Sequence, residues 1–113
     1  MYAEIKLNDA RGEERTVPML ATASTPIRFK MLFGKDLMGG LMNATNGEYD
    51  IDIVSKLGFL MSQQAAKADL MELDNEKYIA WLDDFDSMAF IDHAQEVFSV
   101  YVRSRNNTSK AKK

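Results

Sequence analysis

The first twenty-two residues follow the alternating pattern of a β-hairpin. Apolar and polar positions alternate roughly from Tyr2 to Leu7, as they do along a half-buried strand. The Asn-Asp-Ala-Arg-Gly run that follows has turn chemistry, and residues 16–20 return as a second strand. Pro18 cannot donate a ladder hydrogen bond, so we expect this strand to lie at an edge or to end there. The pattern predicts a hairpin over residues 2–22.

Helical spacing begins at the Ser-Thr-Pro run of residues 24–26. Thr25 is suited to cap a short helix, and Pro26 is suited to its first position, where a missing N–H costs nothing. We expect Gly34 to end this helix in a left-handed conformation. The three-four spacing predicts a core face formed by Ile27, Met31 and Leu32.

A second short helix is expected from Leu37 to Met42, capped by Asp36. Two adjacent glycines at positions 39 and 40 weaken it, each by about 1 kcal/mol. Such a pair either permits close backbone packing or marks a joint. Residues 43–49 read as a loop.

Three stronger helical patterns follow, each preceded by a capping side chain. Asp50 caps a helix to about Ala68, with the core face Ile53, Leu57, Leu60 and Met61. Asp74 caps the next, with the stripe Tyr78, Trp81, Leu82 and Phe85. Ser87 caps the last, with the core face Phe90, Ala94, Val97, Phe98, Tyr101 and Val102.

The predicted fold class is therefore mainly α, within α+β: an N-terminal β-hairpin followed by about five helices in one small domain, residues 1–102. Apolar periodicity stops at Arg103. Residues 1–102 carry 9 basic and 17 acidic side chains, a net charge of −8, whereas residues 103–113 carry +5. We expect residues 103–113 to form a flexible basic tail.

Composition excludes several classes of site. The 113 residues contain no cysteine and one histidine, so disulfides, thiolate metal sites and thiol catalysis are excluded. No apolar run approaches the length of a membrane span, and residues 1–7 lack the pattern of a signal peptide. We therefore expect no membrane association and a cytoplasmic location.

The remaining polar groupings do not form a catalytic or metal site. His93 and Glu96 share a helix face, but one histidine without a second strong ligand makes a poor transition-metal site. Asp83, Asp84 and Asp86 lack the glycine and glutamate of a calcium loop at the required positions. The glycines at 34, 39 and 40 lack the spacing of a phosphate loop. We expect no enzyme activity, no cofactor and no metal.

Methionine is the more informative residue, at 8 of 113. Its flexible, polarisable side chain is over-used on surfaces that bind varied apolar partners. The alternative is that several methionines fill a small helical core. The candidate partner-binding residues are Met31, Met38, Met42 and Met61.

Three segments occur in a distinctive order: residues 25–37 (Thr-Pro, Arg, then Phe-Gly-Lys-Asp-Leu), residues 57–65, and the Trp-Leu-Asp-Asp-Phe run of 81–85. Together they resemble the tail assembly chaperones of long-tailed phages, in the branch common among phages and prophages of Gram-positive bacteria. The resemblance spans about residues 2–102. The residues that match the family motifs are Thr25, Pro26, Arg28, Phe33, Gly34, Asp36, Leu37, Trp81, Leu82 and Phe85.

The resemblance implies a non-enzymatic protein that coats the tape-measure protein before the tail tube forms around it. It also implies a frameshift-extended form that recruits tail tube protein, self-association, and a place in the host bacterial cytoplasm rather than in the mature virion. Two alternatives stay open: a small structural tail component, and a nucleic-acid-associated regulator using the basic tail. Nucleic acid is the less favoured partner because the tail has no aromatic side chain for base stacking.

Overall fold

The structure is a computed structural model that describes residues 1–40 and 49–110, with the backbone alone from residue 103 onward. Strands β1 (Tyr2–Asn8) and β2 (Glu14–Leu20) form the expected antiparallel hairpin, with Tyr2 opposite Leu20 and Asn8 opposite Glu14. Alternate side chains point into the core, and those buried are Ile5, Leu7, Val17 and Met19.

Pro18 lies inside β2 and does not end it. Main-chain hydrogen bonds join the residue pairs just beyond the two ends of the ladder. They run from Ala21 N to Met1 O and from Asp9 N to Glu13 O, and each is 2.8 Å long. Because hydrogen-bonded and non-hydrogen-bonded pairs alternate, the Glu4–Pro18 pair is non-hydrogen-bonded. The nitrogen of Pro18 therefore faces away from β1, and its missing N–H removes no bond from the ladder.

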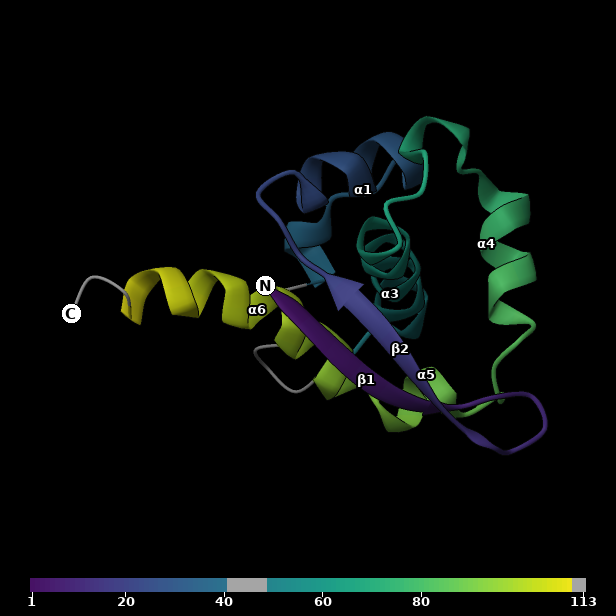
Figure 1. The fold of residues 1–113 in the computed structure, drawn as a ribbon. Helices are drawn as coiled ribbons and strands as arrows, with labels where there is room; N and C mark the ends of the chain where they lie inside the picture. Colours follow the sequence, from purple (N-terminus) through teal and green to yellow (C-terminus); the bar gives the residue numbers. More distant parts are fainter. Residues whose placement is uncertain (41–48, 111–113) are drawn as a thin grey trace.

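The mainly helical fold predicted from the sequence is confirmed, and within the described residues six helices follow the hairpin (Figure 1). One of them includes residues 37–40, where Gly40 packs closely on α3 while Gly39 faces open space. The remaining elements, with the 3-10 turn η1, are α1 (Thr25–Phe33), α3 (Ile51–Ala65), η1 (Leu70–Glu72), α4 (Asn75–Leu82), α5 (Ala89–Asp92) and α6 (Ala94–Lys110).

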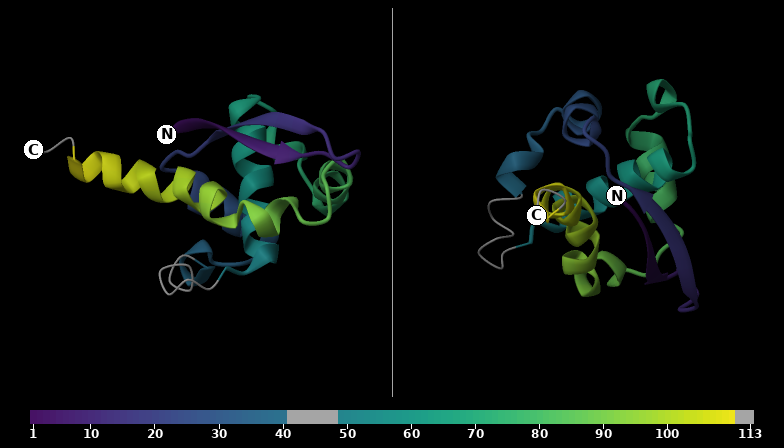
Figure 2. Two further views of the ribbon diagram at one scale, coloured as in Figure 1. Left: turned by 90° about the horizontal axis from the view of Figure 1, so that it is seen from below. Right: turned by 60° about the vertical axis from the view of Figure 1, so that its left-hand side comes forward.

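Helix α3 runs through the centre of the molecule, with the hairpin lying across it and the other helices around it (Figures 1 and 2). Its expected core residues are all buried, and so are Val54 and Phe59 on other faces. The pattern predicted one buried face on α3, whereas the helix is buried on several faces. The cap at Asp50 is confirmed by its hydrogen bond from Asp52 N, 3.0 Å. The helix ends at Ala65, earlier than Ala68, because Lys67 is left-handed with φ 56°.

Among the described residues no helix is long and apolar enough to cross a membrane.

The predicted core face of α1 is wrong. Ile27 and Met31 are 63% and 74% exposed, whereas Thr25 and Phe29 are fully buried. The N-cap is Ser24, one residue before the expected Thr25. The Thr25 hydroxyl instead accepts a hydrogen bond from Thr22 N and donates one to Gln64 Oε1. This hydroxyl anchors α1 on α3 and turns the opposite face outward.

Two expectations for the C-terminal half also need correction. Helix α4 ends at Leu82, so Phe85 is not on the helical stripe; it lies in a following turn and forms a β-bridge with Asp9. Ser87 is not a cap, because Asp86 Oδ2 accepts the hydrogen bond from Met88 N at 3.0 Å.

The last predicted helix is divided at His93 into α5 and α6. Its expected core residues are buried except Val102, which is half-buried. The backbone of α6 continues to Lys110, eight residues beyond the point where the apolar pattern stops. The backbone of residues 103–110, which were expected to belong to a flexible tail, is therefore helical.

Candidate binding groove between α1 and η1

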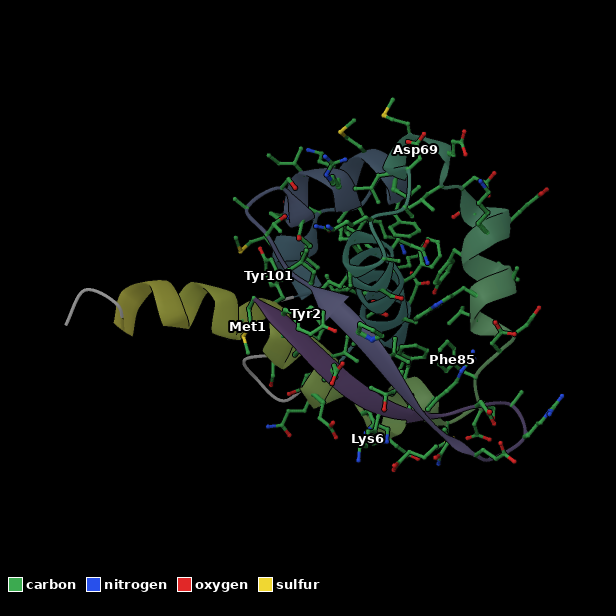
Figure 3. The ribbon with its side chains drawn as sticks, viewed as in Figure 1. Met1, Tyr2, Lys6, Asp69, Phe85 and Tyr101 are labelled. Carbon is green, nitrogen blue, oxygen red and sulfur yellow. The ribbon has the colours of Figure 1, made fainter. Side chains whose placement is uncertain are left out.

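An apolar groove lies between α1 and the segment around η1. It encloses about 180 Å³, and Leu60 of α3, which is buried, forms part of its lining. Met31 and Met71 are 74% and 83% exposed. Figure 3 shows Asp69 where η1 approaches α1. The groove is lined by Arg28, Met31, Leu32, Leu60, Leu70, Met71 and Leu73.

Local chemistry explains why these side chains face outward. On η1, Asp69 Oδ1 accepts a hydrogen bond from Met71 N at 3.0 Å and so shapes a tight turn. Leu70 packs against the core, which leaves its neighbour Met71 pointing to solvent. On α1, burial of Phe29 places Ile27 and Met31, two residues to either side, on the opposite face. The result is a mostly apolar groove with two exposed methionines.

Opposite charges border the groove on its two sides. Helix α1 carries Arg28 and Lys30 and no acidic side chain. The η1 side carries exposed Asp69 and Glu72, and the Lys77 ammonium lies at its end, 2.7 Å from the Glu72 carbonyl oxygen. The arrangement suits an amphipathic helix whose apolar stripe has acidic side chains next to α1 and basic ones next to η1.

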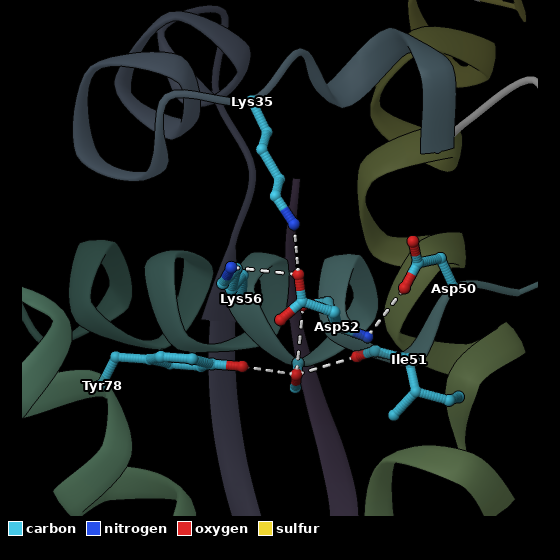
Figure 4. A network of polar contacts seen from close by, with 7 residues as sticks. Lys35, Asp50, Ile51, Asp52, Lys56 and Tyr78 are labelled. Atoms are coloured by element: carbon cyan, nitrogen blue, oxygen red, sulfur yellow. Dashed lines mark hydrogen bonds and ion pairs between the residues drawn. The ribbon is translucent and has the colours of Figure 1, made fainter.

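A polar network behind α1 joins three elements (Figure 4). Asp52 of α3 accepts from Lys35 Nζ at 2.6 Å and from Lys56 Nζ at 3.0 Å. The Lys56 ammonium also lies 5.3 Å from the centre of the Phe33 ring. Nearby, the Tyr78 hydroxyl of α4 is 2.6 Å from Ser55 Oγ, which donates to Ile51 O. These contacts attach the end of α1 and helix α4 to α3.

The network shifts two pKa values in opposite senses. Partial burial favours the neutral form of Asp52, but hydrogen bonds and charges from Lys35 and Lys56 outweigh it and hold the pKa of that carboxyl below its ordinary value. Burial raises the pKa of the Tyr78 hydroxyl, with a further contribution from the Asp52 charge. Every buried side-chain polar atom in the described residues has a hydrogen-bond partner, so the network is a fully satisfied structural one.

The residues that match the family motifs do not form one site. Those of residues 25–37 serve α1 and its ends: Gly34 is the left-handed cap with φ 68°, and Asp36 Oδ1 accepts from Met38 N. Leu37 is buried, Pro26 lies in the first turn and Arg28 borders the groove. Phe33 packs on Phe29 and Tyr78. At another corner, three partly or fully buried residues pack on the core: Trp81, Leu82 and Phe85.

The candidate methionines divide in the same way. Met31 lies in the groove, Met38 is about half-exposed outside it, and Met42 lies outside the described residues. Met61 is fully buried in the core, so its prediction as a partner contact was wrong. The reason is that α3 is enclosed on nearly all sides.

Sequence reasoning missed the second wall of the groove. Residues 69–72, which follow the helix predicted to end at about Ala68, were interpreted only as a connector. Leu70, Met71 and Leu73 nevertheless lie between the two capping residues Asp69 and Asp74. The signal in the sequence is this short group of apolar residues between two capping residues. It is too short to form the buried face of a helix, so part of it is expected to stay exposed.

The polar groupings singled out in the sequence have structural partners. His93 Nδ1 lies 2.8 Å from Glu96 Oε1, and Asp86 caps the turn into α5. In the part of the chain that the structure describes, no cluster of three or more histidine or acidic side chains is suited to hold a metal ion.

The chain was compared with protein-family models, curated proteins and solved structures, and nothing matches it in any of the three.

Proposed function

We propose that this protein is a non-enzymatic tail assembly chaperone that binds apolar helical segments of a phage tape-measure protein. The observation that carries the proposal is the groove between α1 and η1, with Met31 and Met71 exposed in it and opposite charges along its sides. An extended tape-measure chain exposes apolar helices that aggregate unless covered. Flexible methionines suit such a partner because they adapt to side chains of different shape.

The sequence resemblance adds the biological setting. The protein acts in the host bacterial cytoplasm and is absent from the finished virion. Tail tube protein joins through a frameshift-extended form of the chain, and copies of the protein associate along the tape measure. The motifs of residues 25–37, 57–65 and 81–85 support this part of the proposal.

Co-expression with the tape-measure protein tests the groove. The Met31→Asp/Met71→Asp variant puts charge into an apolar surface that is already exposed. Met31 lies in the last turn of α1, where a negative charge opposes the helix dipole, so the stability of the variant itself should fall by about 1 kcal/mol. We expect the wild-type chain to keep the tape-measure protein soluble and co-purify with it, and the variant to lose both effects. Far-UV circular dichroism checks that the variant is folded.

Met88→Asp is the matched control, because Met88 is 45% exposed and lies outside the groove. It should behave as the wild type does. Equal solubility of the tape-measure protein with and without this chain contradicts the chaperone function, whereas equal loss with both variants contradicts the groove alone.

Two further measurements separate the alternatives. A structural tail component is present in purified virions, and a chaperone is not. A nucleic-acid-associated regulator loses salt-sensitive binding when residues 103–113 are removed, since five of those residues are basic. Binding to the tape-measure protein should be indifferent to that truncation.

A further inference from the structure

In the part of the chain that the structure describes, the outer edge of β1 is open over the stretch Tyr2–Lys6. Hydrogen bonds to β2 use the odd-numbered positions of β1, so the main-chain groups of Tyr2, Glu4 and Lys6 point away from β2. Within the described residues no main-chain hydrogen bond reaches these three residues from elsewhere in the fold. An edge of this kind is a template for a further strand.

The β2 edge and the far end of β1 are less suited to a further strand. On β2, Pro18 removes the donor at the centre of the outer edge. At the far end of β1, residues 84–86 run beside the strand, with hydrogen bonds from Asp86 N to Asn8 O at 3.0 Å and from Ala10 N to Asp84 O at 2.9 Å. The free stretch is therefore bounded at one end by a segment that already pairs antiparallel to β1.

A hollow accompanies the open edge on its inner side. Helix α6 packs under β1 and α3 under β2, so a strand added beyond β1 extends over α6 (Figure 2). The hollow encloses about 290 Å³ and includes Ala3 and Ile5 of β1 with Ser99 and Val100 of α6. Side chains on the inner face of an added strand have room there.

We infer that the Tyr2–Lys6 edge binds an extended segment of a different polypeptide as a third, antiparallel strand. Main-chain hydrogen bonds to Glu4 and Lys6 hold it, and alternate side chains give specificity. On the outer face the bound segment carries a basic residue opposite Glu4 and an acidic residue opposite Lys6. On the inner face it carries apolar residues of about valine size, beside Ala3 and Ile5. This site is separate from the α1–η1 groove and does not depend on the proposed function.

The charges favour a different chain over a second copy of this one. In the antiparallel register that pairs the whole free stretch of two copies, the two Glu4 carboxylates lie directly opposite each other, which is unfavourable. A shift of two residues that brings Glu4 opposite Lys6 extends the pairing to Asn8, whose carbonyl already accepts from Asp86 N. The existing ion pair of Lys6 with Glu14 is exposed and 3.7 Å long, so it leaves Lys6 available.

A synthetic peptide with the sequence Glu-Val-Lys-Val-Thr tests the inference. In antiparallel pairing it places Glu opposite Lys6 and Lys opposite Glu4. We expect amide hydrogen exchange at Glu4 and Lys6 to slow roughly twofold at half occupancy, reached at millimolar peptide. The Thr16 amide, which points outward on the β2 edge beside Pro18, should not change. No slowing at Glu4 and Lys6, or equal slowing at Thr16, overturns the inference.

Two sets of variants sharpen the test. Glu4→Pro removes the central outward donor of β1, as Pro18 does on β2, and should abolish binding, while Thr16→Pro on the other edge should not. If either proline variant does not fold, the Glu4→Lys/Lys6→Glu exchange decides: it should bind the charge-swapped peptide Lys-Val-Glu-Val-Thr in preference to the original. If the exchange variant still prefers the original peptide, the inference is overturned. The inference is also overturned if the protein self-associates in ultracentrifugation and Glu4→Pro abolishes that association, because the edge then pairs with a second copy.

Discussion

Asp52 shows how one residue makes stability depend on pH. Its folded-state pKa lies below the unfolded value because Lys35 and Lys56 donate to it, so its contribution is present above about pH 4 and is lost as the pH falls through the folded pKa. We predict that Asp52→Asn lowers the free energy of unfolding by about 0.5–1 kcal/mol near pH 7, allowing for solvent screening. The variant and wild type should converge as the pH falls through the lowered folded-state pKa of Asp52.

Urea denaturation in a series of buffers from pH 7 into the acid range measures this difference. Lys6→Gln is the control, because its ion pair with Glu14 is exposed on both sides and should contribute almost nothing. A loss at Asp52→Asn that stays constant from neutral to acid pH would show that the carboxylate charge is not the cause.

At the scale of elements, α1 shows where sequence reasoning works and where it stops. Its beginning near residue 25 and its end at Gly34 follow from local backbone chemistry, and both were predicted. Its buried face was not predicted correctly, because the spacing of Ile27 and Met31 fits a helix face as well as that of Phe29 and Phe33 does. The choice was made by α3, which receives Phe29 and bonds the Thr25 hydroxyl through Gln64.

Substitutions on the two faces of α1 should therefore differ sharply. Phe29→Ala leaves a cavity in the core and should lower the free energy of unfolding by about 3–5 kcal/mol. Ile27→Ala removes an exposed side chain and should change it by less than about 0.5 kcal/mol. Chemical denaturation compares them; a larger effect at Ile27 would reverse the assignment of faces.

At the scale of the molecule, the hairpin and the helices share one core around α3. Trp81 of α4 lies at a junction in that core, with ring centres 5.5 Å from Phe59 of α3, 4.7 Å from Phe85 and 5.4 Å from Phe90 of α5. The single tryptophan therefore reports on several elements that are distant in sequence.

We predict that Trp81 fluorescence and far-UV circular dichroism follow the same urea transition, as in two-state unfolding of one domain. Circular dichroism reports mainly the helices, whereas fluorescence reports the aromatic junction. A fluorescence transition at clearly lower urea would mean that α4 and its neighbours unfold before the rest.

The sequence by itself determined the hairpin and the caps at Gly34, Asp36, Asp50 and Asp74, because turn chemistry and capping act between residues a few positions apart. Only the tertiary structure decided the outward face of α1, the enclosure of α3 with Met61, and the place of Phe85 beyond its helix. The α1–η1 groove belongs to the second group. Its walls are forty residues apart in sequence, and their meeting depends on what α3 packs against.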